Sequence, residues 1–96
     1  MDSSYERIVA RILDDNDIKW IRPAPLDWYS EDGIKHHYYP DFYLVDYNIY
    51  LDPKNEYCFK VQSEKINYIL SYYDNCIFLH KEQLTKENIF EILEEQ

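Results

Sequence analysis

Two extended, aromatic-rich segments separated by a short polar turn place the strongest constraint on how this chain can fold. The segments run over residues 37–45 and 49–54, and Asp46-Tyr47-Asn48 separates them. Aromatic and β-branched residues favour strands, and a connection this short joins neighbouring antiparallel strands. The pattern therefore predicts a β-hairpin, the second and third strands of the fold.

A helix and a strand are predicted before this hairpin. Apolar residues recur at helical spacing over residues 4–15, behind the candidate N-caps Ser3 and Ser4. Residues 18–22 alternate as a first strand, which ends before a proline because proline has no amide hydrogen to donate. The Ser-Glu-Asp-Gly run at residues 30–33 predicts a hairpin-like turn in the connection that follows.

After the hairpin, residues 55–61 carry no clear pattern. An amphipathic helix over residues 63–73, a strand over 76–80 and a last helix after the candidate N-cap Thr85 complete the series. The expected order is α-β-β-β-α-β-α. It indicates an α/β fold, one domain over residues 1–96, with a mixed sheet flanked by helices and a right-handed parallel crossover into the fourth strand.

Composition and charge limit the classes of function. Hydrophobic residues make up 46% and aromatic residues 18% of the chain, which is enough for a core. No segment resembles a signal peptide or a membrane span, so we expect a soluble, cytoplasmic protein. Cys58 and Cys76 are expected to be small buried residues rather than a disulfide or a zinc site. The net charge of −9 argues against a protein that holds nucleic acid by phosphate neutralisation alone.

Asp41, Asp52 and Lys54 are the candidate reactive residues. Pairing of the hairpin centred on Tyr47 would set Asp41 roughly opposite Pro53, and a shift of one residue would bring Asp52 or Lys54 directly opposite. Two converging carboxylates repel each other unless a cation neutralises them, and Mg²⁺ or Mn²⁺ prefers oxygen ligands. A bound ion would polarise a phosphate and acidify a water, which Lys54 would orient or deprotonate.

The segment Pro40-Asp41, ten further residues, then Asp52-Pro53-Lys54 resembles the motif of the PD-(D/E)xK nuclease superfamily, which has the restriction-endonuclease-like fold. The expected element order is also that of the superfamily core, α-β-β-β-α-β. The residues of this segment are also similar to those of small phage-type nucleases related to homing and mismatch-nicking endonucleases. The resemblance implies a Mg²⁺- or Mn²⁺-dependent endonuclease that cuts DNA, located in the host cytoplasm if a phage encodes it.

The same resemblance assigns supporting residues and exposes two departures from the motif. Glu6, in the first helix, would be a further metal ligand, while Gln62 and Lys65 would lie near the active site. Pro53 stands where an aliphatic residue is usual and removes a ladder donor, so either a bulge lies there or pairing on that side has ended. Asn55 stands where glycine is common, although asparagine tolerates a left-handed backbone.

Structural explanations compete with several of these assignments. Glu6 follows Ser3 by three residues, which fits a capping box as well as a metal site. The two aspartates could be solvated strand-end residues, and Gln62 and Lys65 could be ordinary helix-surface residues. The spacing shared with the lysine favours function for the aspartates.

Candidate substrate contacts are His37, Tyr39 and Trp28. His36 and His37 are neighbours on a predicted strand and face opposite sides, so they do not form one metal site and only one of them can face a cleft. Aromatic rings can stack on unpaired bases, although core packing explains most of the eleven tyrosines.

Two other functions stay open. One is a non-catalytic interaction domain on the same fold, a subunit or inhibitor whose acidic surface meets a basic partner protein. The other is a structure-selective nuclease for branched or single-stranded nucleic acid. It could act as a homodimer, because one small domain holds one active site and cuts one strand.

Overall fold

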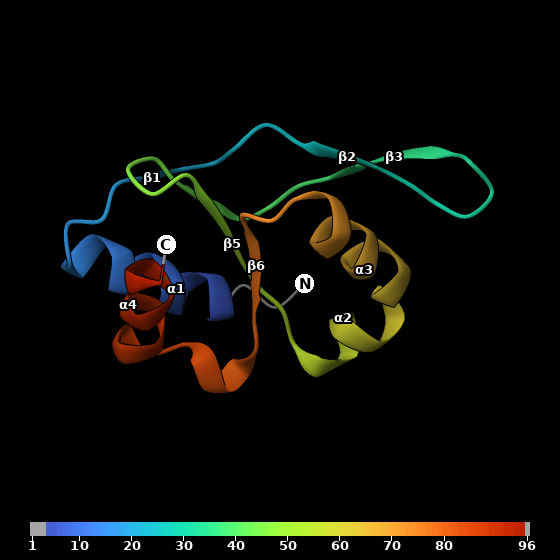
Figure 1. The fold of residues 1–96 in the computed structure, drawn as a ribbon. Helices are drawn as coiled ribbons and strands as arrows, with labels where there is room; N and C mark the ends of the chain where they lie inside the picture. Colours follow the sequence, from blue (N-terminus) through green and yellow to red (C-terminus); the bar gives the residue numbers. More distant parts are fainter. Residues whose placement is uncertain (1–3, 96) are drawn as a thin grey trace.

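The computed structural model describes residues 4–95 as a four-stranded mixed sheet with helices and a separate two-stranded hairpin (Figure 1). The helices are α1 (Ser4–Asp15), α2 (Glu56–Val61), α3 (Ser63–Tyr72) and α4 (Lys86–Glu94), with a 3₁₀ turn η1 (Lys81–Gln83) before α4. The strands are β1 (Trp20–Ile21), β2 (Leu26–Tyr29), β3 (Lys35–Tyr38), β4 (Phe42–Leu44), β5 (Ile49–Pro53) and β6 (Cys76–Leu79). The predicted α/β class with a mixed sheet and a C-terminal helix is confirmed.

The sheet has the strand order β1-β4-β5-β6. Strand β4 runs antiparallel to both β1 and β5. Strand β6 runs parallel to β5, and these two strands correspond to the predicted third and fourth strands, for which a parallel arrangement was expected. The predicted first strand over residues 18–22 is too long, because the Ile18 amide donates to the Leu13 carbonyl oxygen at 2.9 Å and closes α1 instead of joining the sheet. Within residues 4–95, no helix has the length and apolar character needed to cross a bilayer.

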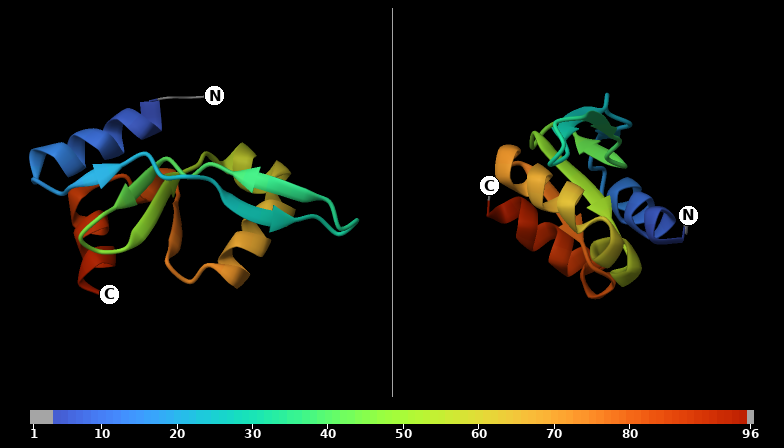
Figure 2. Two further views of the ribbon diagram at one scale, coloured as in Figure 1. Left: turned by 90° about the horizontal axis from the view of Figure 1, so that it is seen from above. Right: turned by 90° about the vertical axis from the view of Figure 1, so that its right-hand side faces the viewer.

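The prediction of one strand over residues 37–45 is wrong, because this segment divides between two sheets. Strand β3 ends at Tyr38 and β4 begins at Phe42, with Pro40 between them, where the missing amide hydrogen interrupts a ladder. Strand β3 pairs with β2 instead, around the predicted turn, in which Gly33 has a φ of 82°. The resulting hairpin lies against α3 and projects beyond it (Figures 1 and 2).

The turn between β4 and β5 contains four residues rather than the three predicted. Leu44 pairs with Ile49, and the Asn48 amide donates to the Leu44 carbonyl oxygen at 2.9 Å. Asn48 adopts a left-handed φ of 56°, which asparagine tolerates better than most residues. Val45 therefore belongs to the turn and not to the strand, and the pairing register differs by one residue from the predicted one. The Val45 amide donates to the carbonyl oxygen of Lys19, on the side of β1.

Side chains alternate between two cores on the two faces of the sheet. Helices α1 and α4 contribute to one core, together with Phe42, Leu44, Ile49, Leu51 and Leu79. Helix α3 and the hairpin form the second core with Tyr38, Cys76 and Phe78, and α1 and α3 lie on opposite sides of β5 (Figure 2). Because it follows Leu51, Asp52 faces the second core, and it is the one fully buried charged residue in the described part of the chain.

Candidate functional site

The register between β4 and β5 decides how the two candidate aspartates meet. Phe42 pairs with Leu51, and one further step along this register sets Asp41 across from Asp52. The predicted pairing of Asp41 with Pro53 is therefore wrong by one residue. The two carboxylates are close enough for Asp41 to raise the pKa of Asp52.

Pro53 lies where β5 no longer pairs with β4. The neighbouring Lys54 amide donates to the Leu79 carbonyl oxygen of β6 at 2.9 Å. Because successive amides point to opposite sides of a strand, the nitrogen of Pro53 faces β4, whose pairing with β5 has stopped at Phe42. The sequence allowed either a bulge at Pro53 or the end of pairing on that side, and the end of pairing is confirmed. This end of β5 lies beside the candidate site.

The Asp52 carboxylate has unequal surroundings at its two oxygens. Its Oδ2 accepts a hydrogen bond from the Tyr38 hydroxyl and lies 3.5 Å from the Lys54 Nζ. Its Oδ1 is buried and receives no hydrogen bond from an N–H or O–H donor among the described residues, although the Asp41 carboxyl lies close enough to share a proton with Asp52. Burial, with a smaller contribution from Asp41, raises the pKa of Asp52 to about 7, although Lys54 and the Tyr38 hydroxyl act in the opposite direction. The arrangement leaves one buried oxygen available to a cation.

Tyr38 and Lys65 complete the surroundings of Asp52. Burial, followed by the charge of Asp52, raises the pKa of Tyr38, so its hydroxyl remains a donor. Lys65 places its Nζ 5.4 Å from the centre of the Tyr38 ring. Burial and then the charge of Lys54 lower the pKa of Lys65, while Asp52 raises it, which places Lys65 near the predicted site residues. The hydrogen bond of Tyr38 to Asp52 was not predicted, because nothing in the sequence distinguishes Tyr38 from the tyrosines that fill the core.

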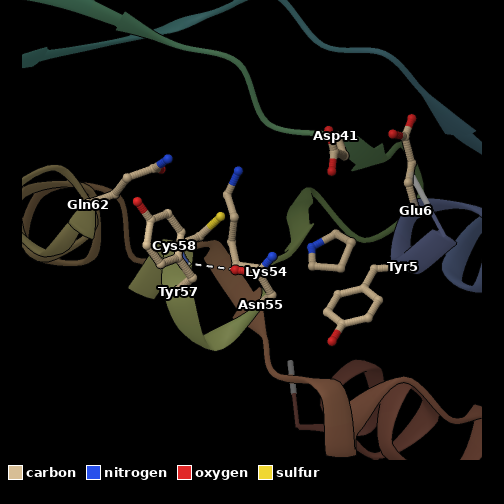
Figure 3. A pocket seen from close by; sticks show the side chains of 9 residues that line it. Tyr5, Glu6, Asp41, Lys54, Asn55, Tyr57, Cys58 and Gln62 are labelled. Carbon is tan, nitrogen blue, oxygen red and sulfur yellow. Dashed lines mark hydrogen bonds between the residues drawn. The ribbon is translucent and has the colours of Figure 1, made fainter. Parts of the chain in front are cut away.

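A cavity of about 390 Å³ opens at the end of β5 (Figure 3). Residues from α1, the start of β4, the end of β5 and the α2 region line it: Tyr5, Glu6, Asp41, Pro53, Lys54, Asn55, Tyr57, Cys58 and Gln62. Glu6 and Asp41 lie on one side, and the Lys54 side chain extends between them and Gln62 (Figure 3). The fold thus gathers four predicted site residues around one cavity, with Asp52 in contact with Lys54.

Helix α2, which was not predicted, shapes one wall of this cavity. Asn55 is its N-cap and accepts a hydrogen bond from the Cys58 amide at 2.8 Å (Figure 3). Asn55 has a φ of −80°, so it does not adopt the left-handed backbone considered for it. Cys58 is half-buried in the cavity wall, whereas Cys76 is buried as expected. The Oε1 of Gln62 is buried and has no hydrogen-bond partner among the described residues.

Arg22 was not predicted as a site residue, yet it contacts the carboxylates of Glu6 and Asp41, which both line the cavity. Its Nη2 pairs with the Glu6 carboxylate, while its Nη1 lies 3.8 Å from the Asp41 Oδ1 and donates to the Asp41 carbonyl oxygen at 3.2 Å. The guanidinium lies about 6 Å from the ring centres of Trp20 and Phe42. Only the pairing of β1 with β4 brings Arg22 here, and no local pattern shows that pairing.

The alternative role of Glu6 in a capping box depends on Ser3, which lies outside the described residues. The Glu6 carboxylate is engaged by Arg22. The role of Glu6 as a metal ligand remains a prediction. It requires Arg22 either to move away from the Glu6 carboxylate or to contact this carboxylate together with the ion.

The three candidate substrate contacts do not line the cavity, although Trp28 lines a smaller hollow together with Gln62 and Lys65. Trp28 stacks on His36 in the hairpin with ring centres 4.5 Å apart, and the His37 Nδ1 lies 3.0 Å from an oxygen of Asp27. Tyr39 follows β3 and is 66% exposed. None of the three predicted residues, Trp28, His37 and Tyr39, is among the described residues that line the cavity, and their roles stay predictions.

The donor set suits one hard cation held by few protein ligands. Within residues 4–95, no group of three or more His, Cys, Asp or Glu side chains is arranged to hold an ion. Asp41 and the unpartnered Oδ1 of Asp52 offer two carboxylates. Mg²⁺ commonly binds through one or two carboxylates and keeps several waters, so these two residues fit it.

The resemblance to the nuclease superfamily rests on the sequence motif and on the order of the predicted elements. Comparison of the chain with models of protein families, with curated proteins and with solved structures found no match.

Proposed function

We propose that this protein is a divalent-metal-dependent endonuclease that hydrolyses phosphodiester bonds in DNA on a restriction-endonuclease-like core. The buried Asp52 carboxylate carries the proposal, because one oxygen meets Lys54 and the other has no described partner. An apolar residue there would be more favourable for folding than an ionisable group that lacks water. A site that must hold a cation gives a reason for the carboxylate.

The arrangement of elements supports the proposed core. Helix α1 precedes β1, β4 and β5, and helices then lead to β6, which gives the order α-β-β-β-α-β once the β2–β3 hairpin is regarded as an insertion. Asp41 directly precedes β4, Asp52 lies in β5, and Lys54 directly follows it. The motif residues therefore lie at the ends of the two central strands of the sheet or directly beside those ends.

Each residue of the site has a distinct proposed role. Asp41 and Asp52 would hold Mg²⁺ or Mn²⁺, which when bound polarises a phosphate oxygen and lowers the pKa of a water. Lys54, only 14% exposed and held by Asp52, presents a positive charge to the cavity. It would orient the attacking water and stabilise the negative charge that develops on the phosphate. Gln62 can accept a hydrogen bond from that water through its unpartnered Oε1.

The net charge of −9 limits how this site can meet DNA. Neutralisation of phosphates by basic residues supplies much of the affinity of most DNA-binding proteins. We expect weak contact that is local, bridged by the divalent cation, or assisted by a second copy or a partner protein in the cytoplasm. Because few basic residues contact phosphates, few counterions are released, so binding should be weak and should depend on salt less steeply than that of most DNA-binding proteins.

The test is cleavage of plasmid and of branched DNA at low salt in Mn²⁺ or Mg²⁺, compared with EDTA. Asp41→Asn should lower the rate by at least about 100-fold, because it removes a charged ligand. Asp46→Asn is the matched control, since Asp46 lies exposed in the β4–β5 turn and loses the same charge. It should keep the wild-type rate. Preference for the branched substrate would identify the structure-selective form of the activity.

If wild-type protein with an intact fold leaves both substrates uncut, the nuclease proposal fails. The second candidate, an acidic interaction domain, would then be preferred. Its support is the net charge of −9, which complements a basic partner protein.

Arg22 provides a separate prediction about cation binding. Arg22→Gln should strengthen Mn²⁺ binding by about three- to tenfold, because removing a positive charge a few ångströms from two carboxylates increases their attraction for another cation. Calorimetric titration with Mn²⁺ measures the change. Arg11→Gln is the control, since Arg11 is 85% exposed and pairs with Asp15 at the other end of α1. Weaker binding by Arg22→Gln would show that Arg22 holds the ligands in place instead of competing.

A further inference from the structure

A second hollow of about 510 Å³ lies between the tip of the β2–β3 hairpin and α3, and none of the proposed site residues lines it. Tyr29 comes from the hairpin, while Tyr68 and Tyr72 come from successive turns of α3. Glu31 and Glu64 stand at its rim. We call these five residues and the hollow between them the tyrosine groove.

The rings of the groove form one connected group. Tyr68 is central, with Tyr72 stacked on it at a centre-to-centre distance of 4.3 Å and Tyr29 at 6.4 Å. On the inner side Trp28 also lies 6.4 Å from Tyr68. Tyr72 is nevertheless 70% exposed and Tyr29 46% exposed. Core packing does not explain rings that remain this open to water, and clustered exposed aromatic rings are typical of contact surfaces.

The negative charge of the groove favours a positively charged ligand. The Glu31 amide donates to the Glu64 Oε2 at 2.8 Å, so the hairpin tip is joined to the first turn of α3 and two acidic residues are held beside the rings. No lysine or arginine is among the described residues that line the groove. The faces of aromatic rings are electron-rich and attract cations, particularly guanidinium groups. Carboxylates at the rim attract the same cations and repel phosphates.

We propose that the tyrosine groove binds a basic segment of a partner protein. An arginine side chain of that segment lies over the exposed ring of Tyr72 and forms an ion pair with Glu64 or Glu31. Charge complementarity favours this partner over nucleic acid, since the whole chain carries a net charge of −9. The proposal is independent of the nuclease activity, because no residue that lines the tyrosine groove also lines the cavity of the proposed active site.

The probe is an acetylated hexa-arginine peptide, titrated at low salt and followed by calorimetry and by NMR chemical shifts. Tyr72→Ala and Glu64→Gln should each weaken binding about three- to fivefold, and the double variant about tenfold or more. The largest shifts should fall on Tyr29, Tyr68 and Tyr72. Tyr72 and Glu64 are both exposed, so their substitution leaves the core intact.

Two matched controls separate the groove from general attraction by an acidic protein. Tyr57→Ala removes a ring that is also 70% exposed but lies in the other cavity. Glu87→Gln removes the same charge from the first turn of α4. Both controls should bind the peptide within about twofold of wild type. Equal weakening by controls and groove variants would overturn the proposal, as would a single-stranded oligothymidylate that binds the groove more tightly than the peptide does.

Discussion

Lys54→Met is expected to lower metal-dependent DNA cleavage by about 10²–10⁴-fold while the protein remains folded. The Lys54 Nζ lies 3.5 Å from the Asp52 Oδ2 and is the positive charge that β5 presents to the cavity. Methionine keeps most of the apolar stem of lysine and removes the terminal ammonium, with its charge and its contact with Asp52. Because that charge acts on the phosphate as it becomes more negative, the loss should appear in kcat rather than in KM. Nicking rates of supercoiled plasmid in Mn²⁺ measure it.

Lys60→Met is the matched control for this substitution. Lys60 is exposed on α2, close to Lys54 in the sequence, and its loss changes the net charge equally. It should leave the rate within about twofold of wild type. Circular dichroism must show the same helix content in all three proteins. Cleavage by Lys54→Met at the wild-type rate would remove Lys54 from the mechanism even if the protein is a nuclease.

The parts of the fold that depend on local pattern were predictable from the sequence. Helix α1 begins and ends at the predicted residues, because its apolar residues recur at helical spacing over its whole length. Thr85 caps α4 through a hydrogen bond from the Asn88 amide, as its residue type indicated. Helix α2 was missed, although Asn55 followed by Glu56 is a recognisable helix start.

The parts that depend on strand pairing were not predictable from local pattern. Tyr38 and Phe42 belong to different sheets, and the predicted single strand gave no sign of the division beyond Pro40. Arg22 reaches Asp41 only because β1 pairs with β4. Alternation along a strand, by contrast, placed Asp52 and Lys54 on one face correctly, since it requires no knowledge of the partner strand.

Burial of Asp52 should make the stability of the protein depend on pH in an unusual direction. The ordinary pKa of 3.8 applies to the unfolded chain, and the folded protein has a pKa of about 7 at Asp52. Between these values the folded state keeps a proton that the unfolded state has lost. The contribution of Asp52 to the free energy of unfolding therefore falls as pH rises from about 4 to about 7, and the loss is complete above it. The difference between the two pKa values corresponds to roughly 4 kcal/mol as an upper bound.

Asp52→Asn is accordingly expected to abolish cleavage and yet to stabilise the fold at pH 8, by about 2–4 kcal/mol. Asparagine has nearly the same shape, and its side-chain oxygen can accept the hydrogen bond that Tyr38 now donates to Asp52. Near pH 4 the wild-type carboxyl is already protonated in the folded state, so the two proteins should differ little there. Urea unfolding at both pH values measures the difference. Equal stabilisation at both would mean that the charge of Asp52 is not the cause.

Added Mn²⁺ should reverse the order of stability at pH 8 if the proposed site is correct. A cation that binds the folded state near Asp52 stabilises it by an amount set by its concentration relative to the Kd. At one thousand times the Kd the gain is about 4.1 kcal/mol, which exceeds the advantage of about 2–4 kcal/mol expected for the Asp52→Asn variant. The Asp52→Asn variant lacks the charged ligand and should gain little, whereas Asp46→Asn should gain as much as wild type. The same carboxylate that weakens the fold without a cation then strengthens it with one. If Mn²⁺ stabilises Asp52→Asn as strongly as wild type, the ion binds elsewhere, and the buried charge of Asp52 needs another explanation.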